Sequence, residues 1–262
     1  MPTDSGHDDG SEEHFFRELQ IQFLVHELKE PLAIIEAGVK SLLEKEEKLG
    51  HLSPRQAKTL RRVLRGASRG RNLVNNLLEI GRSEAGQIIR RPFYPAKTVY
   101  ADLLASIEAM EGECVDQISE TMTEAEVLHL LQQFGIFLHV AAGVDSIEIN
   151  QDEAIFSQIV GNLVRNALRF RKKKLAVALY REGETIAVEI TDDGPGIKPE
   201  DHALIFRRYV QAEAERSTAR TGHGLGLAGA RILARALGGD VSVQSEVGKG
   251  ATFRFKIPLK LQ

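Results

Sequence analysis

The sequence has no tryptophan and a single cysteine, Cys114, among its 262 residues. One cysteine excludes an intrachain disulfide and a cysteine-based zinc site, and it is typical of a reducing compartment. Aromatic residues make up only 6% of the chain, which disfavours a platform for stacking nucleic-acid bases. No apolar run approaches the roughly 18–20 residues that span a membrane, and no signal-peptide pattern opens the chain. We therefore expect a cytoplasmic protein with no membrane span in this chain.

An excess of one charge is also lacking, because 34 basic residues stand against 37 acidic ones, for a formal net charge of −3. Such a balance gives no reason to expect a nucleic-acid partner. Hydrophobic residues at 42% and charged residues at 27% are ordinary for a folded globular protein. At roughly 100–200 residues per domain, the length favours two domains.

The first part of the chain has helical periodicity. Residues 1–11 are polar and acidic, and we expect them to be disordered. From 12 to 48 apolar residues recur at steps of three and four, which predicts one helix roughly 50 Å long, as in a coiled coil or bundle. Its apolar positions are Phe16, Leu19, Phe23, Leu28, Leu32, Ile35, Val39 and Leu42 or Leu43.

A second long helix is predicted from Pro54 to about Ser83. Gly50 marks the turn before it, Ser53 supplies an N-cap and Pro54 takes the first helical position. Two antiparallel helices bury little apolar area by themselves. We therefore expect this hairpin, residues 12–90, to complete a four-helix bundle by pairing with a second copy of the chain.

Residues 90–92 mark a linker, and the second domain, assigned to residues 91–262, mixes helices with strands. Helices are predicted at 96–110, 124–133, 152–170 and 227–237, and strands at 136–140, 175–180, 185–191, 240–245 and 251–258. Several strands follow one another in hairpin style, which favours an α/β sandwich with a mixed sheet.

The segment 111–134 interrupts this pattern and is interpreted as an insertion. Thr123 and Glu126 have the spacing of a capping box, and the apolar residues that follow predict a short amphipathic helix. We expect that helix to pack on its own sandwich, with a docking surface for a partner as the alternative.

The first motif with chemical potential is His26-Glu27-Leu28-Lys29-Glu30-Pro31, inside the first long helix. Pro31 cannot donate a hydrogen bond to the carbonyl of Glu27, so the helix is expected to bend there. A bend beside an exposed His–Glu pair is costly and favours a functional site. By itself the motif is equally compatible with a solvated histidine in a charged helix.

The second motif runs from Asn162 to Phe170. Asn162, Asn166 and Arg169 are four and three residues apart, so they share a helix face. Neutral oxygen ligands beside one cation suit Mg²⁺ bound to a triphosphate, because Mg²⁺ takes hard oxygen ligands and phosphate oxygens complete its shell. Taken alone, the asparagines are more simply polar residues on a helix surface.

The third motif, Asp192-Asp193-Gly194-Pro195-Gly196, directly follows a predicted strand. Two glycines around a proline make a backbone that a ligand can approach closely, and a carboxylate there can accept a hydrogen bond from an exocyclic amino group. An ordinary turn explains the same residues in isolation.

The fourth motif places three glycines, spaced by two, before a helix. The residues are Gly222, Gly224 and Gly226. Their amides can be presented to a phosphate group, although the Lys-Ser pair of a P-loop is missing and no strand precedes them closely. The polar stretch 211–221 before them is interpreted as a lid. The later run Gly248-Lys249-Gly250 predicts a turn into a strand.

In this order, and after a two-helix hairpin, the motifs resemble the cytoplasmic core of sensor histidine kinases of two-component systems. The first motif resembles the phosphoacceptor box of that family. The others resemble the N, G1, G2 and G3 boxes of its ATP-binding domain, which is related to gyrase, heat-shock-90 and mismatch-repair ATPases. Residues 205–209, Ile-Phe-Arg-Arg-Tyr, resemble its F box. The resemblance covers residues 12–96 and 146–258.

The resemblance implies an ATP-dependent kinase that phosphorylates His26. Glu27 would accept or orient the proton of the imidazole ring, which leaves the other ring nitrogen free to attack. Asn166 would bind Mg²⁺, with Asn162 and Arg169 near the phosphates. The phosphoryl group would then pass to an aspartate of a response regulator, and the protein would act as a homodimer.

For the base and the lid, the resemblance implies that Asp192 binds the adenine amino group and that Gly194 and Gly196 shape the pocket. Gly222, Gly224 and Gly226 would form the phosphate side of the lid. Glu30 departs from the family, which often has Thr, Ser or Asn at that position to position water for phosphatase action.

Two rival functions use the same residues: an ATPase of chaperone type, and a degenerate kinase that signals only by contact. The His26 motif inside a dimerising helix argues against the first. The intact Asn166, Asp192 and glycine series argue against the second. The sequence leaves open the signal, the upstream sensor and the identity of the regulator.

Overall fold

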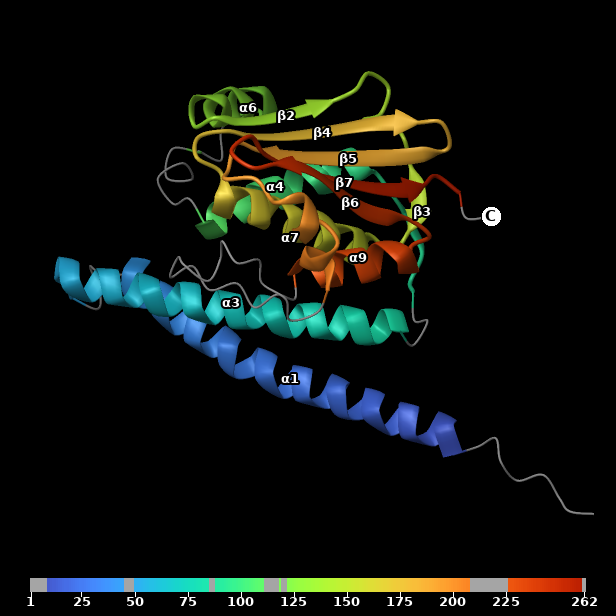
Figure 1. Cartoon of the computed structure of the whole chain (residues 1–262). Coiled ribbons are helices and arrows are strands. Elements are labelled where there is room, and N and C mark those ends of the chain that lie inside the picture. Colours follow the sequence, from blue (N-terminus) through green and yellow to red (C-terminus); the bar gives the residue numbers. More distant parts are fainter. Residues whose placement is uncertain are drawn as a thin grey trace, which may run out of the picture. The chain divides into compact units, whose positions relative to one another are not determined.

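The structure is a computed structural model and describes residues 9–44, 50–84, 88–110, 118, 122–207 and 226–260. It divides into two units, Met1–Gln87 and Ile88–Gln262. The division falls close to the predicted boundary between residues 90 and 91. Figure 1 shows a purely helical first unit and a second unit in which helices lie along a sheet.

The first unit is the predicted helical hairpin, made of α1 (Asp9–Glu44) and α3 (Pro54–Glu84). Residues 9–11, predicted to be disordered, belong to α1, because acidic side chains favour the first turn of a helix. Residues 1–8 and 45–49 lie outside the described part. Helix α3 begins as predicted, since Ser53 and Gln56 exchange hydrogen bonds across the first turn.

A buried carboxylate joins the two helices. Glu36 on α1 is only 7% exposed, accepts a hydrogen bond from the Ser68 hydroxyl at 2.7 Å, and forms an ion pair with Arg71 at 2.8 Å. Nearby, a Cβ atom on Gly70 would lie 3.3 Å from Leu32, so this glycine lets the helices pack closely. Val39 and two α3 residues, Ala67 and Val74, are buried in the same unit.

The second unit is built on a five-stranded mixed sheet with strand order β2-β4-β5-β7-β6. Only β2 and β4 are parallel, and the other pairs are antiparallel. The strands are β2 (Ile136–Val140), β4 (Leu175–Glu182), β5 (Thr185–Asp192), β6 (Asp240–Glu246) and β7 (Gly250–Pro258). The predicted α/β sandwich with a mixed sheet is therefore confirmed.

Helices α4 (Pro95–Met110), α7 (Glu153–Phe170) and α9 (Gly226–Ala236) lie along one face of this sheet (Figure 1). Alternate residues of the strands point to that face, and their side chains form the core with the apolar stripes of α4 and α7. The largest fully buried side chains include Phe156, Phe253, Phe255, Leu103, Ile107, Ile155, Ile159 and Leu163. Helix α7 is the central element of this layer, because it packs against both α4 and α9.

A small second sheet was not predicted. β1 (Arg91–Phe93) pairs antiparallel with β3 (Ile149–Gln151), so residues 91 and 92, predicted to be a linker, lie in a strand. The buried ring of Phe93 packs edge-on against Phe156 with their centroids 5.3 Å apart. Three-residue strands are too short to produce a periodic pattern in the sequence, which explains the error.

The predicted helix in the insertion is α6 (Glu124–Gln133), and its capping box between Thr123 and Glu126 is present. Val127 and Leu131 are buried, and the helix packs against β2. This favours packing on its own domain over a docking surface. Residues 111–117 and 119–121 lie outside the described part.

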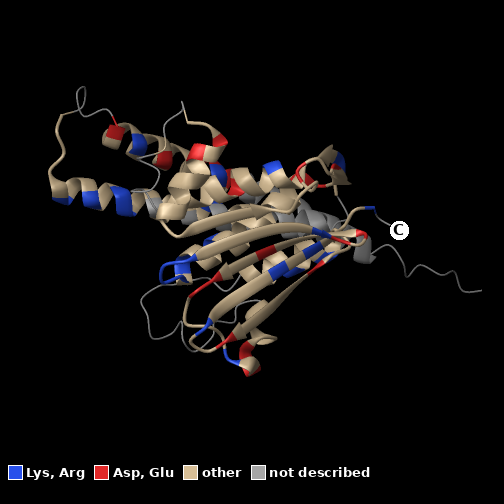
Figure 2. Cartoon of the chain, turned by 90° about the horizontal axis from the view of Figure 1, so that it is seen from above, with Lys and Arg blue, Asp and Glu red and all other residues tan. Residues whose placement is uncertain are grey.

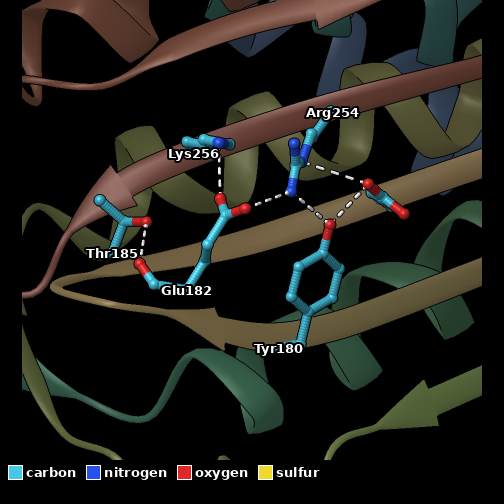
Figure 3. A network of polar contacts seen from close by, with 6 residues as sticks. Tyr180, Glu182, Thr185, Arg254 and Lys256 are labelled. Atoms are coloured by element: carbon cyan, nitrogen blue, oxygen red, sulfur yellow. Dashed lines mark hydrogen bonds and ion pairs between the residues drawn. The ribbon is translucent and has the colours of Figure 1, made fainter. Parts of the chain in front are cut away.

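The opposite face of the sheet carries a polar network across β4, β5 and β7 (Figure 3). The Tyr180 hydroxyl donates to Glu189 at 2.5 Å and accepts from Arg254 at 2.8 Å. Arg254 also contacts Glu182 at 3.1 Å, and Lys256 forms an ion pair with the same carboxylate at 2.5 Å. Figure 2 shows acidic and basic residues interspersed along these strands. Cross-strand pairs of this kind hold the register of the sheet.

Candidate functional site

The site of the second unit starts from Asp192, the last residue of β5. Its side chain is 4% exposed, and Oδ1 accepts a hydrogen bond from the amide of Gly194 at 2.8 Å. Burial raises the pKa of Asp192, while hydrogen bonds from the amides of Gly194 and Ala251 oppose that rise. One carboxylate oxygen is thus fixed by the chain itself, and the group lies on the helix-covered side of the sheet.

The glycines after Asp192 are required by close backbone contacts. A Cβ atom on Gly194 would lie 2.6 Å from Oδ1 of Asp192 and 2.6 Å from the carbonyl oxygen of Phe170. Gly196 has φ +72°, and its Cβ would lie 2.0 Å from the carbonyl oxygen of Glu246. The loop therefore touches both the last turn of α7 and the β6–β7 turn.

The β6–β7 turn holds this loop in place. The amide of Ile197 donates to the Ser245 hydroxyl at 2.8 Å, which donates in turn to the carbonyl oxygen of Gly250 at 2.6 Å. The amide of Gly248 donates to the carbonyl of Pro195 at 2.6 Å. The sequence predicted only a turn here, because the contact depends on which strands are neighbours in the sheet.

Asp193 organises the next loop. Its Oδ1 accepts from the amides of Lys172 at 2.8 Å, Lys173 at 3.0 Å and Lys174 at 3.0 Å. Although partial burial raises it, these backbone hydrogen bonds hold the pKa of Asp193 below its usual value. The run of three lysines is visible in the sequence. Its hydrogen bonds to Asp193, however, are donated by the backbone amides and not by the lysine ammonium groups.

Helix α7 carries the second motif. Asp152 caps its N-terminus by accepting from the amides of Ala154 and Ile155. Asn162 is buried, while Asn166 and Arg169 are half-buried on the same helical face. The guanidinium of Arg169 lies 5.1 Å from the centre of the Phe170 ring. Since the Phe170 carbonyl approaches Gly194, the structure brings the second and third motifs together.

The fourth motif is described only in part. Gly226 is the first residue of α9, which packs against α7, whereas Gly222 and Gly224 lie outside the described residues, as does the predicted lid at 211–221. The segment that resembles an F box, residues 205–209, begins within the 3₁₀ turn Leu204–Phe206, and the guanidinium of Arg231 lies 4.9 Å from the centre of the Phe206 ring. This turn thus packs on the glycine-initiated helix α9.

The remaining motif belongs to the first unit. His26 is a helical residue of α1, and its side chain lies outside what the structure describes. Glu27 and Glu30 are exposed on the same helix. Helix α1 continues through Pro31 without a break. The candidate residues predicted from the sequence thus belong to two different units.

Two family models match the chain. The model described as histidine kinase-, DNA gyrase B- and HSP90-like ATPase matches residues 151–261, and the model of the His Kinase A (phospho-acceptor) domain matches residues 16–86. The chain carries the catalytic core of a sensor histidine kinase. The second match contains His26, and the first contains all the predicted nucleotide residues from Asn162 to Gly226 of this kinase core.

Curated relatives agree with this assignment. The sensor histidine kinase MtrB of Mycolicibacterium paratuberculosis is 28% identical over 249 residues, which cover 93% of this chain and 40% of that protein. The sensor protein SrrB of Staphylococcus aureus is 28% identical over 259 residues, which cover 95% of this chain and 40% of that protein. The kinase core therefore spans about 40% of the length of these relatives.

Solved structures have the same fold. Full-length ShkA in complex with AMPPNP aligns with a TM-score of 0.60 at 25% identity, over 93% of this chain and 46% of that one. The Acinetobacter baumannii histidine kinase AdeS aligns with a TM-score of 0.52 at 20% identity, over 90% of this chain and 98% of that one. Among the helices of the described residues, none has the length and apolar character of a membrane span.

Proposed function

We propose that this kinase core binds Mg·ATP in its second unit, transfers the γ-phosphoryl group to His26, and passes it to an aspartate of a response regulator. The observation that carries the nucleotide part is the contact between the two motifs at Gly194. There the end of α7, which bears Asn166 and Arg169, meets the loop that Asp192 anchors. Full-length ShkA, whose structure holds AMPPNP, supports a nucleotide as the ligand.

The adenine base is assigned to Asp192. Oδ1 already accepts from Gly194, so Oδ2 is the oxygen that would accept a hydrogen bond from the exocyclic amino group of the base. Gly194 and Gly196 shape this pocket by letting the loop lie against the carbonyl oxygens of Phe170 and Glu246. A buried carboxylate facing an N–H donor discriminates for a base with an amino group.

The phosphates and the metal are assigned to α7 and to the start of α9. Asn166 offers a half-buried carboxamide oxygen, which fits Mg²⁺ as one hard ligand among phosphate oxygens. Bound there, the ion would neutralise charge on the triphosphate. Asn162 and Arg169 would contact the phosphates, and the amides of Gly222, Gly224 and Gly226 would donate to them.

The transfer itself needs a free imidazole nitrogen on His26. That nitrogen forms a bond to the γ-phosphorus as the bond to the bridging oxygen of ADP breaks, and ADP leaves. The proton on the other ring nitrogen is held by the Glu27 carboxylate, which keeps the attacking nitrogen unprotonated. Positioning and charge neutralisation supply most of the catalysis in such a transfer.

Dimerisation is supported by an apolar stripe on α1. Leu28, Ile35 and Leu42 are 50%, 43% and 39% exposed and recur every seven residues. A seven-residue repeat on one helix is typical of a seam that a second helix covers. Pairing two hairpins along this stripe would give the four-helix bundle that the sequence predicts.

The experiment that separates this function from its rivals uses ATP with a radioactive γ-phosphate. A histidine kinase gives protein-bound label that is lost in acid and stable in alkali. An ATPase would release labelled phosphate without labelling the protein, and a degenerate kinase would do neither. Absence of acid-labile protein label under conditions where ATP binds would reject the proposed reaction.

A further inference from the structure

A polar cluster lies between α4 and α7, beside the motif that carries the phosphate residues. Asp102 on α4 accepts a hydrogen bond from the Ser157 hydroxyl at 2.5 Å. About two turns further along α7, Nη2 of Arg165 donates to Oδ1 of Asn162 at 2.9 Å. The charges of Asp102 and Arg165 attract each other across this cluster.

Gly161 provides the space for this arrangement. A Cβ atom at this position would lie 2.7 Å from Nη1 of Arg165 and 3.4 Å from its Cζ. The guanidinium therefore lies against the bare backbone of α7, and its side chain turns back toward Asn162 instead of extending into solvent. A substitution at Gly161 would displace the guanidinium.

The carboxylate of Asp102 lies in a buried environment that disfavours its charged form. Burial raises the pKa of Asp102 to about 6, against the opposing effects of the Ser157 hydrogen bond and of Arg165, and Glu153 raises it further. Burial likewise lowers the pKa of Arg165, and Asp102 opposes that change. Oδ2 of Asp102 is buried and has no hydrogen-bond partner among the described residues. Burial thus disfavours the charged forms of both Asp102 and Arg165, and their opposite charges partly offset this loss of solvation.

The contact with Arg165 decides which way the Asn162 carboxamide faces. A guanidinium only donates hydrogen bonds, so the atom that it contacts must be the carboxamide oxygen. The –NH₂ group of Asn162 then points away from Arg165. Such a group can donate to a phosphate oxygen, whereas it cannot bind a metal cation as the carboxamide oxygen of Asn166 can.

We propose that Arg165 is a positioning residue for the nucleotide: it holds the Asn162 carboxamide with its –NH₂ group toward a phosphate of ATP. This inference rests on the proposed ATP site. Arg165 does not touch the nucleotide and acts through Asn162.

The test compares binding of ATP with binding of adenosine, which lacks phosphates, by calorimetry on the full chain. Arg165→Met keeps the length and apolar stem of the side chain and removes its donors. We expect ATP to bind about tenfold more weakly, as when a hydrogen bond to a charged group is lost. Adenosine should bind within about twofold of the parent, because Asp192 and its loop are untouched.

Two further variants make the result specific. Arg181→Met removes an exposed arginine that donates hydrogen bonds to Gly183 and Glu184 in the β4–β5 turn, and it should leave both affinities unchanged. In an Asn162→Ala background, Arg165→Met should cause no further loss of ATP affinity, because the group that it positions is gone. Arg165→Lys, which keeps the charge and a donor, should recover part of the loss and also serves if Arg165→Met does not fold.

Equal weakening of ATP and adenosine, or additive losses in the double variant, would overturn the inference in favour of a purely structural role. Unchanged ATP affinity in Arg165→Met would overturn it as well. Failure of the parent protein to bind ATP would reject the proposed function. If the parent and Arg165→Met bind ATP equally well, the proposed function stands and only the inference about Arg165 fails.

Discussion

Gly250 lies so close to Asp192 that a Cβ atom on the glycine would be 1.9 Å from the carbonyl oxygen of the aspartate. The two residues belong to neighbouring strands, and Asp192 is paired with Ala251 in the register of β5 and β7. The backbone of the proposed base-binding residue thus lies against the start of a different strand, at a residue without a side chain.

Substitution of Gly250 by alanine tests this relationship. Both Gly250 and Gly248 have positive φ, at +87° and +84°, so alanine at either position costs about 1–2 kcal/mol of backbone strain. Only Gly250 adds a steric clash, since a Cβ on Gly248 meets nothing within 4 Å. We expect Gly250→Ala to lower the free energy of unfolding by more than Gly248→Ala in denaturant titrations. Equal losses would show that the contact with Asp192 is not limiting.

Asp192→Asn tests the assignment of this residue to the base. The variant replaces one acceptor oxygen with a donor, which would face the amino group of adenine. ATP affinity should fall by about tenfold, while affinity for inorganic triphosphate stays within about twofold. Both are measurable by competition with a fluorescent nucleotide. A parallel loss of ATP and triphosphate affinity would place Asp192 at the phosphates instead.

Asp102 should leave a signature in the pH dependence of stability. Its folded pKa of about 6 lies above its unfolded value, so its contribution to stability is fully present below the unfolded pKa, about 3.9, and is lost as pH rises through about 6. We expect the free energy of unfolding of the parent, relative to Asp102→Asn, to fall across this window by up to about 1–2 kcal/mol after solvent screening. Urea titrations at successive pH values measure the difference. A constant difference would mean that Asp102 titrates normally.

The exposed stripe on α1 predicts the oligomeric state. Ile35→Lys places a charge on the seam, and the dimer should dissociate at least about tenfold more readily, because each copy loses an exposed isoleucine that pairing would bury. Ala37→Lys, at an exposed position on another face of the same helix, is the matched control. Analytical ultracentrifugation reports both. A dimer that survives Ile35→Lys and dissociates with Ala37→Lys would move the interface to another face of α1.

The elements that the sequence predicted well are those with long periodic patterns or local caps. The two long helices, α7 and α6 with its Thr123 capping box were all anticipated, because each is determined by residues near one another in the chain. Strands β1 and β3 were missed, since three residues carry no period. Motif spacing singled out Asp192 and Asn166 as candidates, and the resemblance to a family gave each of them a specific role.

The supporting parts of the site could not be read from the sequence in the same way. Asp102 and Ser157 are 55 residues apart, and only the packing of α4 on α7 makes them neighbours. Ser245 likewise reaches the loop at Ile197 only because β6 and β7 form a hairpin whose turn meets that loop. Such contacts depend on tertiary packing, which periodicity and capping rules do not describe.

The central claim, that His26 receives the phosphoryl group from ATP bound in the other unit, is tested most directly by labelling His26→Ala and His51→Ala beside the parent. Each protein is incubated with ATP carrying a radioactive γ-phosphate, and the protein-bound label is divided into acid-labile and acid-stable fractions. We predict that the parent and His51→Ala carry acid-labile label and that His26→Ala carries none while binding ATP within a few-fold of the parent. Acid-labile label retained by His26→Ala would contradict the account.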